Sequence, residues 1–178
     1  MADKELFVLL GVYPEPDLAH DDYHDLRILH NSGRVGAYDA AVIVKDATGK
    51  VDKHERETAR EHGAWSGIAA GAVVGLLFAP TIVGAVVVGG VAGRVVGHVR
   101  KGLKGADVKD LADALADGES ALLVIGAGDM AEQAERVLSR SRKRIVKPLD
   151  VDHKAFAEAL AEAEREHGET LEGTLKVD

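Results

Sequence analysis

The sequence contains no cysteine, few aromatic residues and, over one long stretch, no charged residue. The absence of cysteine excludes disulfide bonds, thiolate catalysis and cysteine-based zinc sites. Aromatic residues make up only 4% of a chain that is 46% hydrophobic, so alanine and valine supply much of its apolar content. The net charge of −8 argues against a general nucleic-acid-binding protein, and we expect no nucleic-acid partner.

The N-terminal residues lack the pattern of an export signal. Residues 1–10 (MADKELFVLL) have an acidic start, and their apolar run is too short for a signal peptide. We therefore expect a protein that is synthesised in the cytoplasm and not exported.

The uncharged stretch runs from Gly63 to Gly93 and contains no Asp, Glu, Lys or Arg. Its glycines recur at every fourth position, which on a helix places them on one face where another backbone can approach closely. Pro80 separates two such series and is expected to turn the chain, because proline disrupts a helix. The pattern predicts a hairpin of two short apolar helices that self-associates through Gly63, Gly67, Gly71, Gly75, Gly89, Gly93 and Gly97.

The length of this hairpin bears on whether it crosses a membrane. Its first arm, Trp65 to Phe78, would span about 21 Å as a helix, against about 30 Å for the hydrocarbon core of a bilayer. A shallow re-entrant hairpin or a thin-membrane span therefore fits best. The alternative is a soluble homo-oligomer or shell that buries its hairpins between subunits. The residues expected to contact lipid head groups are Trp65, Arg94, Arg100, Lys101 and Lys104.

Strand and helix patterns alternate on both sides of the hairpin. The first side predicts strands at Glu5–Val12, Tyr38–Lys45 and Val51–Glu55, a helix from Asp17 to about Asn31, and the start of another helix at Glu57–His62. The second side predicts helices at Asp107–Ala116, Asp129–Ser139 and Asp152–His167, and strands at Ser120–Ile125 and Arg144–Lys147, the latter stopped by Pro148. Residues 168–178 are expected to form a tail or an edge strand.

The repeated strand–helix–strand order predicts an α/β (α+β) protein. Two such units form a ferredoxin-like split βαβ sheet with helices on one face, and the glycine-zipper hairpin is inserted between them. Residues 1–62 and 102–178 would then be the two halves of one α/β domain, and residues 63–101 the inserted hairpin.

Several of these segments carry a resemblance to a known family. Residues 111–125 (LADALADGESALLVI), residues 144–150 (RIVKPLD), residues 38–51 (YDAAVIVKDATGKV) and the glycine-rich stretch resemble an uncharacterised bacterial family of predicted membrane proteins. This is the domain-of-unknown-function family twelve sixty-nine. The resemblance covers most of the chain and implies a membrane-associated bacterial protein of unknown activity. It supplies no catalytic residues.

Two motifs are candidates for ligand binding. Gly126 and Gly128 in IGAGDMA follow a predicted strand and match a dinucleotide fingerprint, although Asp129 would place a negative charge near the phosphate. The alternative is a tight turn into a helix capped by Asp129. His20 and His24 lie one helical turn apart, a spacing that can hold a metal ion, but they also fit a solvated helix face.

The other charged residues are expected to be solvated. The densest basic run, Arg140, Arg142, Lys143 and Arg144, is interpreted as a surface loop that offsets nearby acids, since no aromatic residues interleave with it. Asp21, Asp22 and Asp25 are expected to keep one face of the first helix in water.

The sequence therefore favours a non-enzymatic, self-associating protein without a cofactor, on the cytoplasmic side of the inner membrane. The alternatives are a soluble cytoplasmic assembly and a nucleotide-binding regulatory module. No catalytic arrangement of Ser, His and Asp or of paired carboxylates is identifiable from spacing.

Overall fold

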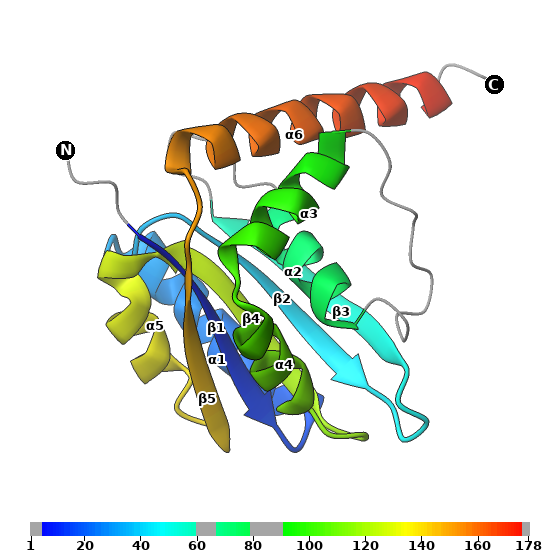
Figure 1. The fold of residues 1–178 in the computed structure, drawn as a ribbon. Coiled ribbons are helices and arrows are strands. Elements are labelled where there is room, and N and C mark those ends of the chain that lie inside the picture. Colours follow the sequence, from blue (N-terminus) through cyan, green and yellow to red (C-terminus); the bar gives the residue numbers. More distant parts are fainter. Residues whose placement is uncertain (1–4, 60–66, 79–90, 176–178) are drawn as a thin grey trace.

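The computed structural model describes residues 5–59, 67–78 and 91–175, and of residues 53–59, 91–92 and 167–175 it describes only the backbone. The described chain has an α+β fold with five strands and six α-helices (Figure 1). In chain order the elements are β1 (Leu6–Tyr13), α1 (Pro16–Asn31), β2 (Tyr38–Lys45), β3 (Val51–Ala59), α2 (Ile68–Phe78), α3 (Val91–Gly102), α4 (Gly105–Asp113), β4 (Ser120–Ala127), a 3-10 turn (Gly128–Met130), α5 (Ala131–Val137), β5 (Lys143–Leu149) and α6 (His153–Leu175).

The five strands form one antiparallel sheet in the order β3-β2-β4-β1-β5. β4 lies between β1 and β2, and β1 lies between β4 and β5. The two strand–helix–strand units therefore interleave, and the parts of the chain before and after the inserted helices contribute to the same sheet.

Helices cover both faces of the sheet (Figure 1). α1 and α5 pack on one face, over a core that includes Leu9, Leu26 and Leu122. The inserted helices α2 and α3 pack on the other face together with α4 and α6. The helices of the two units share one face as expected, and the apolar insertion covers the second face.

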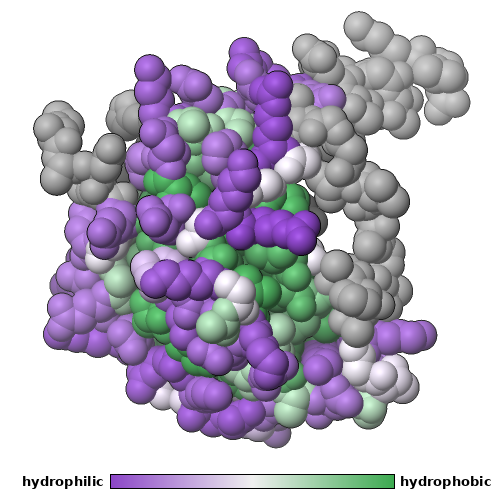
Figure 2. Space-filling view, in the orientation of Figure 1, coloured by the Kyte–Doolittle hydropathy of each residue, from purple (hydrophilic) through white to green (hydrophobic). Residues whose placement is uncertain are grey.

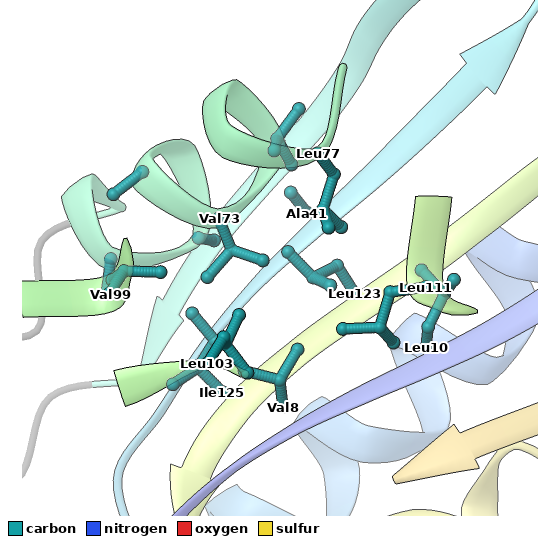
Figure 3. Close-up of a cluster of buried hydrophobic side chains, with 14 of the residues drawn as sticks. Val8, Leu10, Ala41, Val73, Leu77, Val99, Leu103, Leu111, Leu123 and Ile125 are labelled. Atoms are coloured by element: carbon teal, nitrogen blue, oxygen red, sulfur yellow. The ribbon is translucent and has the colours of Figure 1, made fainter. Parts of the chain in front are cut away.

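The second core is built from alternate residues of the strands and from the inserted helices. Successive side chains of a strand point to opposite faces, so Val8 and Leu10 of β1 lie on the same side as Leu123 of β4. Val73 of α2 and Leu111 of α4 pack against them, and all five side chains are fully buried (Figure 3).

Three predicted boundaries are wrong, each for a physical reason. Glu57 lies in β3 and does not start a helix, because β3 pairs with β2 as far as Ala59 and this pairing overrides the local charged composition. Pro148 lies inside β5, opposite Phe7, since proline is tolerated in an edge strand. α6 continues to Leu175 through Gly168, because a single glycine costs a helix only about 1 kcal/mol.

Much of the predicted hairpin is described, but its turn is not. α2 and α3 are two short helices that pack against each other (Figure 1). Gly67 precedes α2 with φ 76°, a conformation that favours glycine. The predicted residues Gly63, Trp65, Pro80 and Gly89 lie outside the described residues.

Within the ranges that the structure describes, none of the helices is long and apolar enough to cross a membrane.

Candidate functional site

α2 is the most unusual element of the fold because its sequence, IAAGAVVGLLF, has no polar side chain. Such a helix is normally buried on all sides or embedded in lipid. Its inner side faces the sheet, where Val73 and Leu77 pack near Ala41 and Leu123 (Figure 3). The apolar insertion therefore forms part of the domain core.

A buried carboxylate ties the start of α2 to the sheet. The Oδ2 atom of Asp39, on β2, accepts a hydrogen bond from the backbone N–H of Ala70 at 2.9 Å, and the Asp39 side chain is fully buried. A negative charge is favourable at the N-terminus of a helix, where backbone N–H groups lack partners. Because α2 has no acidic residue in its own first turn, the neighbouring strand supplies this charge.

The outer side of α2 remains apolar although it is partly exposed. Ile68, Gly71, Gly75 and Leu76 are all of intermediate exposure. Figure 2 shows hydrophobic residues in green over α2, below strongly hydrophilic side chains over α3. A Cβ atom added at Gly75 would meet no other atom within 4 Å. The helix therefore has open space at this glycine.

The outer side of α3 also contains glycines, but it is charged where that of α2 is apolar. Gly93 and Gly97 are each two positions from a buried valine, Val95 or Val99, so they lie on the opposite side of the helix. A Cβ atom added at Gly97 would also meet nothing within 4 Å. Of the predicted glycine series, Gly75 on α2 and Gly97 on α3 thus have open space beside them, whereas Gly67 is buried before α2.

Four cations lie beside this outer side. Arg94, Arg100 and Lys101 are exposed on α3, and Lys104 is exposed directly before α4. Arg94 makes an ion pair with Glu162 of α6, with 2.8 Å between its Nη1 atom and Oε2. We call these four residues the cationic flank.

A second cluster of charged residues lies on the face of the sheet that α1 and α5 cover, and it is centred on Asp22 of α1. The Asp22 side chain is fully buried and accepts hydrogen bonds from the Tyr13 hydroxyl at 2.8 Å, from the Arg140 backbone N–H at 3.1 Å and from Arg140 Nη1 at 2.6 Å. Arg140 Nη1 also donates to Asp25 at 2.7 Å. The prediction of a solvated Asp22 is therefore wrong, whereas Arg140 lies in an exposed turn and offsets nearby acids, as predicted.

The packing around Tyr13 explains how this cluster forms. A Cβ atom at Gly11 would lie 2.9 Å from the Tyr13 hydroxyl and 2.7 Å from Leu138 Cδ2, so glycine leaves room for the phenol ring. Burial raises the pKa of the Tyr13 hydroxyl, and the adjacent Asp22 carboxylate raises it further. Tyr13 therefore stays protonated and acts as a hydrogen-bond donor.

Two other residues of the basic run, Arg142 and Arg144, also make hydrogen bonds. Arg142 makes two hydrogen bonds to the Glu119 carboxylate, at 2.5 Å and 2.6 Å, and these lower the pKa of Glu119. Arg144 donates to the backbone carbonyl of Glu135 at 3.1 Å. These contacts attach β5 and the turn before it to neighbouring elements.

The fingerprint glycines are explained by packing of the protein against itself. A Cβ atom at Gly126 would lie 2.8 Å from Met130 Sδ, and one at Gly128 would lie 3.0 Å from the Glu5 carbonyl oxygen. The Gly128 N–H already donates to that carbonyl at 2.6 Å. β4 is antiparallel to both its neighbours, whereas the dinucleotide fold needs a parallel βαβ unit.

The two predicted metal ligands, His20 and His24, both lie on α1. The His24 ring contacts Tyr23 edge-on, with 5.7 Å between ring centroids. In the described part of the chain, no group of three or more His, Asp or Glu side chains is arranged to hold a metal ion.

The fold and these clusters define an α+β protein in which an apolar helical insertion completes the core and leaves one side of α2 partly exposed. The family model for DUF1269, a protein of unknown function, matches residues 64–163. The chain belongs to this family, and the match extends from the start of the insertion into α6. No curated protein and no solved structure matches the chain significantly.

Proposed function

We propose that this protein is a non-enzymatic module that associates with copies of itself at a membrane surface. The observation that carries the proposal is the outer side of α2 and α3, which is apolar on α2 and cationic on α3 and has open space at Gly75 and Gly97. We also propose that the interleaved sheet is of the ferredoxin-like split βαβ class, with β3 and the helices added to it.

Gly75 and Gly97 support self-association because no contact within the chain requires glycine at either position. Glycine in a helix interior costs about 1 kcal/mol relative to alanine. Gly75 and Gly97 lie within α2 and α3, neither has a positive φ, and no atom lies close to where a Cβ would be. Close approach of a helix from another copy would account for both, since small residues let two backbones come together.

The edges of the sheet are less suited to association than the helical layer. The outer strand β5 contains Pro148 and Lys147, which discourage pairing with a further strand. The other outer strand, β3, has a register shift between the partners of Val42 and Ile43, so His54 is left opposite no β2 residue. Such bulges also protect an edge.

Replacing Gly75 and Gly97 together by leucine tests the proposal. The new side chains would hold neighbouring helices apart, so the mass of the native particle, measured by light scattering, is expected to fall towards that of one chain. Gly105→Leu is the control, because Gly105 is exposed at the start of α4 and also has nothing within 4 Å. A monomeric native protein, or an unchanged particle in the Gly75/Gly97 variant, would contradict the proposal.

Neutralising part of the cationic flank tests contact with the membrane. Each cation near an anionic lipid surface contributes about 1 kcal/mol, so Arg100→Gln with Lys101→Gln is expected to weaken vesicle binding about thirtyfold. Arg34→Gln with Arg136→Gln is the control, since it removes the same charge from exposed positions elsewhere. Binding is measured by co-sedimentation with anionic and neutral vesicles at low and high salt.

Two results of this experiment would redirect the proposal. Equal binding to neutral and anionic vesicles would remove the role of the cationic flank. Self-association without any vesicle binding would instead support a soluble homo-oligomer that buries α2 and α3 between its subunits.

A further inference from the structure

α6 runs antiparallel along α3, and α6 and the segment that leads into it contact α3 at three successive levels (Figure 1). At the first level, the Gly102 carbonyl accepts a hydrogen bond from the Asp150 N–H at 3.0 Å. At the second, the rings of His98 and Phe156 meet edge to face, with 6.2 Å between centroids. At the third, Arg94 and Glu162 form the ion pair that joins the cationic flank to α6.

The first of these levels is held firmly. A Cβ atom at Gly102 would lie 2.6 Å from Val151 Cγ1 and 2.9 Å from Leu149 Cδ1, so the segment that leads into α6 packs directly on this glycine. The Asp152 carboxylate then accepts a hydrogen bond from the Ala155 N–H at 2.7 Å and caps the helix. The start of α6 is therefore fixed relative to the end of α3.

The third level is held weakly. The Arg94 side chain is 66% exposed and that of Glu162 is 41% exposed. Ion pairs in such positions contribute little to stability and are screened by salt. The side chains that α6 buries nearby include the small Ala159 and Ala163. Loss of this ion pair is therefore expected to cost the fold little stability.

We infer that α6 is an intramolecular mask, in which Glu162 occupies Arg94 and withholds it from anionic lipid. Arg100, Lys101 and Lys104 stay available while Arg94 is paired. The inference rests on the proposed membrane contact and adds its regulation. The partner that displaces Glu162 is the phosphate of an anionic lipid, which offers the same charge and oxygen acceptors to the guanidinium group.

Neutralising Glu162 tests the mask. Glu162→Gln is expected to tighten binding to anionic vesicles about fivefold at low salt relative to Glu158→Gln, because one more cation becomes available. Glu158 is an exposed residue one turn earlier on α6, so its variant has the same net charge and similar helix propensity. The difference between the two variants therefore reports the release of Arg94 rather than the overall charge.

Arg94→Gln supplies a second measurement. It is expected to weaken binding less in the native protein than Arg100→Gln does, and to abolish the gain from Glu162→Gln when the two changes are combined. Equal binding of Glu162→Gln and Glu158→Gln, with salt-sensitive binding of the native protein, would overturn the mask and leave the membrane contact standing. Binding by none of these proteins would overturn both.

Discussion

An aspartate in place of Val73 is expected to unfold the domain. Val73 is fully buried where α2 meets the sheet, close to Ala41 and Leu123 (Figure 3). A carboxylate there would be without partners in an apolar core, a change expected to lower the free energy of unfolding by at least about 4 kcal/mol. Urea denaturation followed by circular dichroism measures the effect.

Leu76→Asp is the matched control for this experiment. Leu76 lies three residues further along α2 but is partly exposed. Its aspartate can reach water, so the variant is expected to remain folded. If Val73→Asp were as stable as Leu76→Asp, α2 would not be packed on the sheet, and a hairpin that leaves the sheet for lipid would be the better description.

Truncating Asp22 to alanine is expected to lower the free energy of unfolding by about 3 kcal/mol, because it leaves buried partners without their acceptor. The Tyr13 hydroxyl and the Arg140 backbone N–H would both lose their hydrogen bonds. Asp21→Ala is the control, since the Asp21 side chain is 59% exposed and its nearest contact with Arg140 is 3.9 Å long. That change is expected to stay within about 0.5 kcal/mol.

Two further variants identify the cause. Asp22→Asn keeps the shape and one acceptor oxygen, so it should recover part of the stability that alanine loses. Tyr13→Phe removes only one hydrogen bond, which is typically worth about 1 kcal/mol. Equal stabilities of Asp22→Ala and Asp21→Ala would show that the cluster does not stabilise the fold.

The regular elements could be predicted from the sequence because their signals are local. The apolar run of β1 and the strand Tyr38–Lys45 lie where periodicity and turn residues placed them. β3 was predicted too short, because its second half is specified by pairing with β2 and not by its own charged residues. The local sequence pattern of a strand does not show which other strand it pairs with.

The clusters could not be predicted because they depend on contacts between distant parts of the chain. Nothing local distinguishes Asp22 from its neighbour Asp21, yet only Asp22 is buried, against an arginine 118 positions away. The orientation of α2 relative to the sheet could not be predicted from the sequence either. A helix that is apolar on every side gives no amphipathic signal to show which side meets the sheet.

The interleaved strand order has a consequence for synthesis of the protein. When residues 5–59 have left the ribosome, β2 and β3 can pair, but β1 has neither of its neighbours, β4 and β5. α2 then emerges before Ser120, the first residue of the strand that completes the surface it packs on. The apolar helix α2 is therefore exposed to water until β4 has been synthesised. During that interval it is accessible to chaperones, to lipid and to other nascent chains.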